Sequence, residues 1–355
     1  MRATSRSLAA QVRSLREAGG LTQAQLAVRA GVSRQMVGAI EAGRHLPRVD
    51  AGVALARALG TTIESLLAPD TTEVTAAVDV LDEAAAASGP VRVGRVGDRL
   101  VCAPPPAGGD SWGRADGFLR PGGVELLPGA RPGAVVAGCD PAIGLAARLV
   151  TEHGLEQRRG RRPGGVVSLL AVSASTRAAL DALKGRRTHA AVVHGPDGAL
   201  PAPPVAVHRW QLARWQVGLA APLDLPGGWW RDALRGRRRV VQREAGAGSQ
   251  AAFERALTAA GSRRPGGPRA RGHLDAANVA RTAGLVAVTI EPAARAAGLA
   301  FHPLEVHVAQ LWVATEWAAE PGIVRLGEEL ASSAFQSQLA AVGGYDLTDC
   351  GKAVA

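Results

Sequence analysis

Three short polar stretches between residues 138 and 250 carry the side chains best suited to holding a small ligand. Each follows an apolar run and precedes an Ala- and Leu-rich segment, so each is expected where a strand ends and a helix begins. The positions concerned are Asp140, Ser173, Ser175, Thr176, Gly248 and Ser249. Helix N-termini have free N–H groups, and open α/β sheets bind ligands at the carboxyl ends of their strands. The pattern therefore predicts a small-molecule binding site.

Asp140 bears on the chemistry of that ligand. A carboxylate beside an anion is electrostatically unfavourable unless it points away. Asp140 either caps the helix that starts near Pro141 or faces the site. In the second case, a ligand with an amine or hydroxyl group is favoured over an oxyanion.

Three further side chains close to expected strand ends each have two possible roles. His194, at the carboxyl end of HAAVVHG, is either a hydrogen-bonded structural histidine or a ligand contact. Arg243 could pair with a ligand carboxylate or be solvated among other arginines. Glu291 follows VAVTI and is either a helix cap or a wall of the site. All three are included among the candidate ligand contacts.

Residue patterns typical of catalysis are missing from the sequence. It has no GxSxG elbow, no HExxH, no P-loop and no GxGxxG after a strand, so an enzyme is not expected. The three cysteines, Cys102, Cys139 and Cys350, lie far apart. Their spacing argues against a disulfide framework or a zinc site and favours a reducing compartment. We expect no cofactor and no metal.

The elements that must position the candidate ligand contacts occupy residues 131–355. There, short apolar runs bounded by Gly or Pro alternate with helical stretches, which is typical of an α/β domain with mostly parallel strands. Residues 71–130 are expected to form a helical linker over 71–88 and a β-hairpin that turns at Gly97-Asp98.

Residues 1–70 have the pattern of short helices around a small core. Thr22 and Gln25 have the spacing of a capping box, Gly31 allows a tight turn, and Ser33 can cap the next helix. In that helix Val37 and Ile40 are three residues apart and face inward; two further helices are expected to follow. This spacing predicts an all-α domain built on two helices joined by a short turn.

The stretch LTQAQLAVRAGVSRQMVGAIEAGRHLPRVDAGVALARALGTTIESLL, residues 21–67, resembles the Cro/Xre-type helix-turn-helix of phage repressors and many bacterial regulators. The resemblance rests on LTQxxLA, AGVS, the I-E-x-G helix end and the Leu-Gly near its close. It implies that double-stranded operator DNA is a partner and that the second helix of the motif enters the major groove.

The resemblance also assigns roles to individual side chains of this domain. Ser33, Arg34 and Gln35 would reach base edges, since Arg can pair with guanine and Gln with adenine through two hydrogen bonds. The implied phosphate contacts, which position the protein without specifying sequence, are Gln23, Arg44 and Arg48. One such domain reads few bases, so a homodimer on paired half-sites is expected.

Residues 131–351 resemble the periplasmic-binding-protein-like sensor domains fused to bacterial helix-turn-helix regulators, which are related to molybdate-type solute-binding proteins. The stretches that carry this resemblance are AGCDPAIGL, ALDALKGRRTHAAVVHG, the segment 243–250, ARTAGLVAVTIEPAARAAGLAFHPL and SSAFQSQLAAVGGYDLTDCGK. The resemblance implies two α/β lobes with a cleft between them, and chain crossings near residues 205–218 and 300–312.

The formal net charge of +10 comes almost entirely from arginine. This balance favours nucleic acid or another polyanion as a partner, although a solvated arginine-rich surface is an equal alternative. The N-terminus is polar and basic where a signal peptide would be apolar, and no run reaches about 18 apolar residues. We therefore expect a cytoplasmic protein without a membrane partner.

Together these patterns predict a multidomain protein, with an all-α helix-turn-helix domain (1–70), a linker and hairpin segment (71–130), and an α/β two-lobed ligand-sensing domain (131–355). The function they favour is a ligand-responsive one-component transcription regulator with a small-molecule effector. Two alternatives stay open. One is a DNA-binding interaction protein with a ligand-free scaffold domain, and the other is an enzyme fused to a helix-turn-helix.

Overall fold

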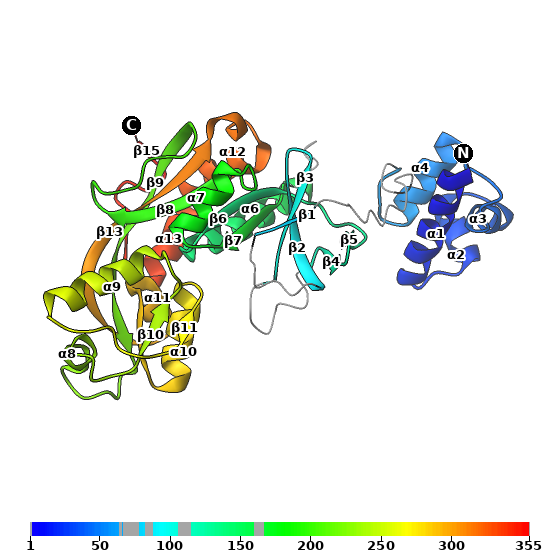
Figure 1. The fold of residues 1–355 in the computed structure, drawn as a ribbon. Helices are drawn as coiled ribbons and strands as arrows, with labels where there is room; N and C mark the ends of the chain where they lie inside the picture. The colour runs from blue at the N-terminus through cyan, green and yellow to red at the C-terminus, as the bar shows by residue number, and fades with distance from the viewer. Residues whose placement is uncertain are drawn as a thin grey trace. The chain divides into compact units, whose positions relative to one another are not determined.

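The computed structural model of the chain describes residues 2–63, 66, 78–81, 88–105, 115–159 and 167–354. The chain divides into two units, Met1–Val74 and Thr75–Ala355 (Figure 1). The first is built from helices and the second from helices and strands. This is the predicted fold class, an all-α domain followed by an α/β domain.

The first unit contains α1 (Arg2–Ala18), α2 (Gln23–Ala30), α3 (Arg34–Glu41) and α4 (Val49–Ala58). The predicted capping box is confirmed, because the Thr22 side chain accepts from the Gln25 backbone N–H and the Gln25 side chain accepts from that of Thr22. Gly31 ends α2 in the left-handed region, at φ +64°. Ser33 caps α3 by accepting from the Met36 backbone N–H. These caps fix the turn between α2 and α3.

The inward faces of these helices share one apolar core. Leu26 from α2, Val37 and Ile40 from α3 and Leu55 from α4 are almost completely buried there. The predicted inward positions of Val37 and Ile40 are thus confirmed. Removing such side chains from water stabilises a fold by about 1.5–3 kcal/mol each.

A small sheet with the strand order β1-β3-β2-β4-β5 begins the second unit. Its strands are β1 (Val78–Val80), β2 (Gly89–Val96), β3 (Arg99–Ala103), β4 (Gly117–Arg120) and β5 (Gly123–Leu126). The predicted hairpin is confirmed, since β2 and β3 pair antiparallel on either side of Gly97-Asp98. Val96 and Val101 of this sheet pack against strands of the larger sheet in one apolar cluster, which joins the two sheets.

The helix predicted over residues 71–88 is wrong where the structure describes the segment. Val78–Val80 is a strand that pairs in parallel with Leu100–Cys102 of β3, and Val80 packs against the apolar cluster of the small sheet. The Ala-rich composition favours a helix, but pairing with an existing strand edge overrides that local preference. The rest of the predicted helix, 71–77 and 82–87, lies outside the described residues.

The larger sheet has ten strands, eight of them in the order β11-β10-β12-β9-β13-β8-β6-β7. One lobe contains β6 (Ala134–Gly138), β7 (Leu169–Ser173) and β8 (Ala190–Pro196); the other contains β10 (Val240–Arg243), β11 (Arg269–Ala270) and β12 (Val286–Ile290). We call these lobe one and lobe two. Within each lobe the neighbouring strands are parallel, as predicted.

Two long strands, β9 (Val207–Ala221) and β13 (Ala300–Ala314), pass between the lobes and pair antiparallel with each other. β9 also pairs with β12 of lobe two, and β13 with β8 of lobe one. The two predicted chain crossings are therefore confirmed. The short strands β14 (Tyr345–Asp346) and β15 (Ala353–Val354) pair with β9.

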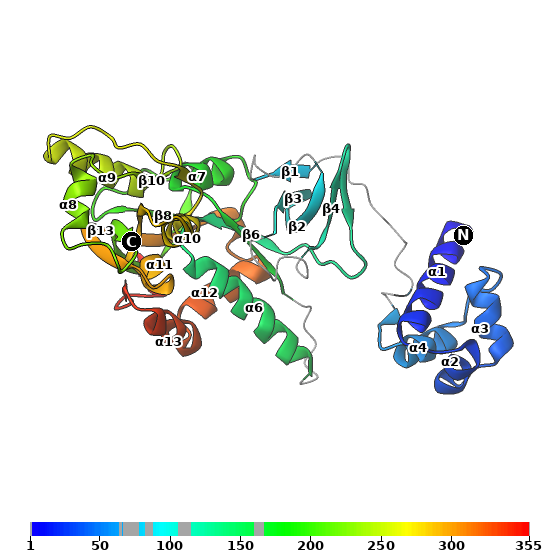
Figure 2. The ribbon, with the colours of Figure 1, turned by 90° about the horizontal axis from the view of Figure 1, so that it is seen from below.

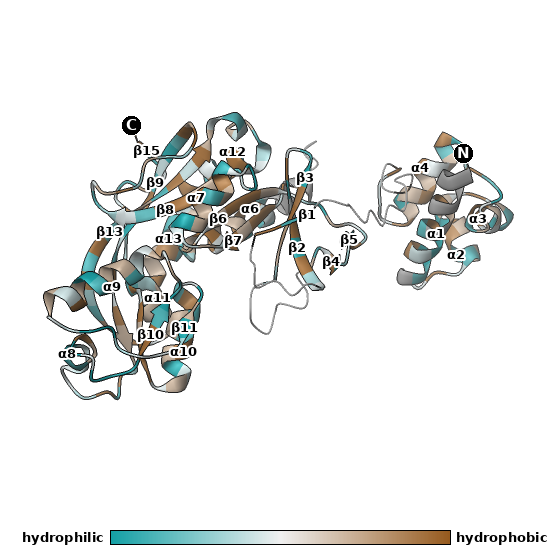
Figure 3. Cartoon of the chain, in the orientation of Figure 1, coloured by the Kyte–Doolittle hydropathy of each residue, from teal (hydrophilic) through white to brown (hydrophobic). Residues whose placement is uncertain are grey.

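Helices cover both faces of each lobe. Lobe one has α6 (Ala142–Arg159), α12 (Pro321–Leu330) and α13 (Ser333–Val342) on one side and α7 (Thr176–Lys184) on the other (Figure 2). Lobe two has α8 (Trp229–Leu234), α9 (Gly248–Ala259), α10 (His273–Ala283) and α11 (Glu291–Ala296), and a short 3-10 turn, η2 (Thr315–Trp317), follows β13. Apolar residues are frequent along β2 and along the strands around β6 and β7 (Figure 3). Every residue of β6 and β12 is buried, as expected for strands covered on both faces.

No helix among the described residues is both long enough and apolar enough to cross a membrane.

Gly218 tests how tightly the crossing strands approach. A Cβ at this position of β9 would lie 2.2 Å from the His302 carbonyl oxygen of β13. We expect Gly218→Ala to lower the free energy of unfolding of the second unit by about 1–3 kcal/mol, because backbone cannot move aside cheaply. Gly327→Ala is the matched control, since its Cβ would enter open space on α12 and should stabilise by about 0.5–1 kcal/mol. Equal effects of the two changes in denaturant unfolding would contradict this account.

Candidate functional site

The exposed side chains at the start of α3 are those predicted to read bases. Ser33, Arg34 and Gln35 are all exposed, and the Ser33 hydroxyl also caps the helix. Arg44 and Arg48, the predicted phosphate contacts after α3, are exposed too, and Arg48 is the N-cap residue of α4. The structure thus leaves these five side chains accessible to a partner.

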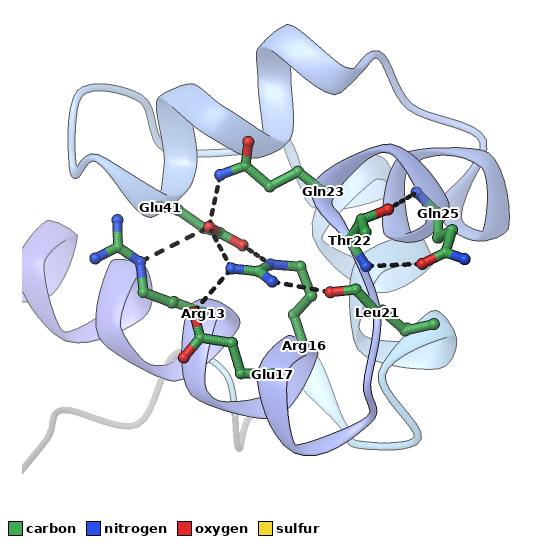
Figure 4. Close-up of polar contacts among 8 residues, drawn as sticks. All are labelled: Arg13, Arg16, Glu17, Leu21, Thr22, Gln23, Gln25 and Glu41. Atoms are coloured by element: carbon green, nitrogen blue, oxygen red, sulfur yellow. Dashed lines mark hydrogen bonds and ion pairs between the residues drawn. The ribbon is translucent and has the colours of Figure 1, made fainter.

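A buried carboxylate at the end of α3, that of Glu41, links three elements of the first unit (Figure 4). It is 5% exposed and accepts hydrogen bonds from Arg16 Nε at 2.6 Å and from Gln23 Nε2 at 2.8 Å. Arg16 also donates to the Leu21 carbonyl oxygen, at 2.8 Å. Glu41 therefore holds α1, the start of α2 and α3 in one arrangement. In the sequence, Glu41 stands out only as part of the I-E-x-G helix end, and nothing close to it in the chain signals this buried role.

Among the described residues, Gln23 is the one predicted phosphate contact that has a hydrogen-bond partner within the protein. Its side chain is half-buried and its amide nitrogen donates to Glu41, which fixes the direction of the amide. Burial raises the pKa of Glu41, but the hydrogen bonds from Arg16 and Gln23 outweigh burial and hold this pKa below the ordinary range of a carboxyl group. Glu41 is therefore ionised at neutral pH.

A second polar site lies between lobe one and lobe two. Most of the side chains that form it are buried and come from the ends of strands and the starts of helices in both lobes. We call it the interlobe cluster, and its members are Cys139, Asp140, His194, Trp215, Arg243, Ser249, His273, His307 and Tyr345. Four of the nine, Asp140, His194, Arg243 and Ser249, are among the predicted ligand contacts.

Asp140 follows β6, and its carboxylate accepts three hydrogen bonds. Its carboxylate accepts hydrogen bonds from the Ala142 backbone N–H at 2.9 Å, the Trp215 indole N–H at 2.8 Å and the Tyr345 hydroxyl at 2.8 Å. The bond to Ala142 supports the helix-cap alternative from the sequence. These donors are neutral, so they stabilise the charge of the carboxylate without cancelling it, whereas burial raises the pKa of Asp140.

Arg243, at the end of β10, is 1% exposed and ties lobe two together at this site. Its guanidinium forms an ion pair with Glu244, whose oxygens accept from Nε at 2.9 Å and Nη2 at 2.8 Å. Nη1 donates to the Ser249 hydroxyl at 3.2 Å and to His273 Nδ1 at 2.6 Å. The solvated alternative considered for Arg243 is thus wrong, because its charge is neutralised inside the protein.

His194 begins a relay of hydrogen bonds that ends at a carboxylate. Its Nδ1 lies 3.0 Å from Nδ1 of His307, whose Nε2 lies 2.8 Å from the Glu305 carboxylate. Burial lowers the pKa of His194 to about 3 and also lowers that of His307, so both rings are neutral at neutral pH. His194 is therefore buried and hydrogen-bonded, at the position where a ligand contact was expected.

The other predicted ligand contacts lie around the interlobe cluster, with one exception. Ser175 caps α7, and the Thr176 hydroxyl lies 3.4 Å from the His194 backbone nitrogen. Gly248 lies beside His194, since a Cβ on Gly248 would be 3.0 Å from His194 Cε1. The exposed Ser173 hydroxyl lies beside Gly272, the residue before His273, since a Cβ on Gly272 would be 3.0 Å from it. The exception is Glu291, which pairs with Arg295 one turn along α11, at 2.7 Å.

Sequence reasoning missed five members of the interlobe cluster, namely Cys139, Trp215, His273, His307 and Tyr345. His273 starts α10, three residues after the end of the short strand β11. Its position at a helix start was the one available signal. Cys139 lies next to the predicted contact Asp140 in the sequence, whereas Trp215, His307 and Tyr345 lie on crossing strands or a distant segment, where spacing carries no signal.

Glu41→Gln tests the buried ion pair of the first unit. We expect the free energy of unfolding of this unit to fall by about 1.5–3 kcal/mol at neutral pH, because Arg16 loses a charged partner. The folded pKa of Glu41 is lowered, so the stabilisation is present at neutral pH and is lost as the pH falls through the carboxyl range. Hydrogen exchange of the amides of α1 to α3 measures this. Wild type should weaken on acidification more steeply than the variant.

Glu17→Gln is the matched control for this experiment. Glu17 also contacts Arg16, at 3.1 Å, but its side chain is 61% exposed. An exposed pair contributes little, so this change should be nearly neutral. If Glu17→Gln destabilised the unit as much as Glu41→Gln, burial would not be the source of the effect.

Comparison with known proteins assigns both parts of the chain. Residues 7–68 match the model of a helix-turn-helix domain, and residues 158–330 match that of the PBP superfamily domain. No curated protein sequence matches the chain significantly.

Similar solved structures are found for each part separately. The restriction-modification controller protein C.AhdI from Aeromonas hydrophila is 32% identical over 18% of this chain and 94% of its own, with a TM-score of 0.17. A Clostridium perfringens structure described as a phosphate ABC transporter substrate-binding protein, with bound phosphate, is 11% identical over 60% of this chain and 98% of its own, with a TM-score of 0.46. The OxyR regulatory domain from Pseudomonas aeruginosa is 14% identical over 56% and 96%, with a TM-score of 0.41. By its two family matches, the chain combines a helix-turn-helix domain with a PBP superfamily domain.

Proposed function

We propose that this protein is a ligand-responsive one-component transcription regulator. Its helix-turn-helix domain binds operator DNA, and a small effector bound at the interlobe cluster changes that binding. The observation that carries the proposal is the presence, in one chain, of a helix-turn-helix domain and a two-lobed domain whose lobes meet at buried polar groups. The protein acts in the cytoplasm, where operator DNA is accessible.

The exposed start of α3 supports the DNA-binding part of the proposal. Arg34 and Gln35 are exposed and have the donor patterns that read guanine and adenine in the major groove. Arg44 and Arg48 extend the positive charge beyond the helix, where phosphates would lie. Glu41 fixes the direction of the Gln23 amide, which would be a third contact to the DNA phosphates. Since one domain of this size reads few bases, we propose a homodimer on paired half-sites.

The composition of the interlobe cluster supports the effector part. It contains donors and acceptors from both lobes, and the helix starts at Thr176, Gly248 and His273 add backbone N–H groups. A ligand that contacts both lobes favours their closed arrangement by its differential affinity for that state. Coupling to DNA follows if closure changes the spacing of the paired N-terminal domains. Such coupling is typically 1–3 kcal/mol, or about 5–150-fold in affinity.

Gln35→Ala and Arg44→Ala test the proposed division of DNA contacts. We expect Gln35→Ala to weaken binding to the selected operator by about 1–3 kcal/mol and to relax the preference at one base position. Arg44→Ala should weaken binding to all duplexes and reduce the salt slope by about 1. The measurement is selection from random duplexes followed by salt-dependent titration. Arg57→Ala, which removes an exposed charge from α4, is the control and should change neither preference nor slope appreciably. A loss of base preference in that control would contradict the assignment.

A thermal-shift screen of metabolites and oxyanions tests the effector. A bound effector should stabilise the second unit, by about 2.7 kcal/mol at 100 times its Kd. Ser173→Ala should reduce the shift without changing the ligand-free melting temperature, because Ser173 is exposed beside the cluster. Ser262→Ala, on a loop of lobe two, should leave the shift unchanged. An effector that binds but leaves operator affinity unaltered would refute the coupling, and a protein that responds to nothing would be a scaffold.

A further inference from the structure

Three side chains of the interlobe cluster converge with the geometry of a metal site. Cys139 follows β6, His194 lies on β8 and His273 starts α10. One ligand atom from each, a sulfur and two ring nitrogens, lies within 4.8 Å of the others, and all three residues are buried. Zinc bonds to sulfur and nitrogen are about 2.0–2.3 Å long, so an ion fits among these atoms after a small inward movement.

The hydrogen-bond relay leaves His194 with a free lone pair. The Glu305 carboxylate can only accept, so His307 donates from Nε2 and its Nδ1 has no proton. His307 Nδ1 in turn accepts from Nδ1 of His194. The remaining ring nitrogen of His194, Nε2, is then unprotonated. Metal-binding histidines usually donate their other ring N–H to an acceptor that fixes the tautomer, and here that acceptor is His307, which Glu305 orients in turn.

His273 provides an independent sign that a ligand is bound here. Arg243 can only donate, so His273 Nδ1 accepts and the proton of the neutral ring is on Nε2. That Nε2 is buried and has no hydrogen-bond partner in the structure, and His273 is 1% exposed. A buried polar atom without a partner costs about 1–3 kcal/mol. A bound ion that takes the place of the Nε2 proton would remove this cost.

We propose that Cys139, His194 and His273 bind a divalent zinc-like cation between the two lobes. One cysteine sulfur and two histidine ring nitrogens are ligand atoms typical of Zn²⁺, and three protein ligands leave a fourth position for a water or an effector atom. On binding, the Cys139 thiol proton and the His273 Nε2 proton leave to solvent, and Arg243 stabilises the resulting imidazolate from its Nδ1 side. Two protons are exchanged for one divalent cation, so the total charge of this buried cluster does not change. A monovalent cation would leave one negative charge uncompensated, which is costly at a buried site.

The ligands come from both lobes, so the cation would hold the lobes together. Cys139 and His194 belong to lobe one, and His273 belongs to lobe two. This regulatory consequence rests on the proposed function, in which lobe closure controls DNA binding. Cation binding itself does not depend on DNA and is measured without it.

The test uses the reduced, metal-free full chain titrated with Co²⁺ as a spectroscopic probe for zinc. We expect a thiolate-to-Co²⁺ charge-transfer band in the near ultraviolet that saturates at one equivalent and disappears when Zn²⁺ is added. Cys139→Ser should lose the band, and His273→Gln should weaken Co²⁺ binding. His307→Leu, which removes the support of His194 without touching the ion, should weaken Zn²⁺ affinity by about 10–100-fold.

Two substitutions elsewhere in the chain serve as matched controls. Cys102→Ser removes another buried thiol, in the small sheet, and His208→Gln removes an exposed imidazole on β9. Both should keep the charge-transfer band. Circular dichroism without metal checks that each variant is folded, and His273→Gln and His307→Leu keep the test informative if Cys139→Ser is unstable. The absence of a band in wild type, or its survival in Cys139→Ser, would overturn the proposal.

The outcomes separate this inference from the proposed function. If Co²⁺ or Zn²⁺ does not bind, the metal site is wrong, whereas operator binding through α3 is tested independently by Gln35→Ala. If the metal binds and its ligands are as assigned but operator affinity is the same with and without Zn²⁺, the metal site stands and its control of DNA binding is wrong.

Discussion

The antiparallel pairing of β9 with β13 is the constraint on which the second unit depends. Both strands are 15 residues long, and they connect lobe one, through β8, to lobe two, through β12. Because they are paired nearly throughout, the lobes share one continuous sheet. The carboxyl ends of β6, β8 and β10 then lie at the same interlobe region. His307 and Trp215 lie on the crossing strands themselves and complete that region, since His307 is hydrogen-bonded to His194 and Trp215 to Asp140.

Both units use a buried charge with several partners to fix the elements around a functional surface. Glu41 joins α1, α2 and α3 through Arg16 and Gln23, and Arg243 joins β10, α9 and α10 through Ser249 and His273. A buried charge is costly unless every part of it is paired, and that requirement restricts the arrangements it tolerates. α3 and the interlobe cluster are each positioned by this requirement as well as by apolar packing.

Sequence reasoning identified more of the predicted surface of α3 than of the interlobe cluster. The surface of α3 depends on residues close together in the chain, so Ser33, Arg34 and Gln35 could be placed from caps and helical spacing. The interlobe cluster combines segments more than a hundred residues apart, as in the pair of His194 and His307. Only side chains at strand ends and helix starts, such as Asp140 and Arg243, could be singled out in advance.

The sequence by itself determined the helix-turn-helix domain, the two chain crossings and the alternation of strands and helices in each lobe. The helices of that domain and the alternation follow from local signals, namely caps, turns and hydrophobic period, which act over a few residues, whereas the crossings were implied by the family resemblance alone. Only the tertiary structure decided that Val78–Val80 is a strand, that Arg243 is buried and paired, and that Cys139, His194 and His273 meet. The reason is physical: strand pairing, burial and ligand convergence depend on neighbours that are distant in the chain, and local propensity carries no information about them.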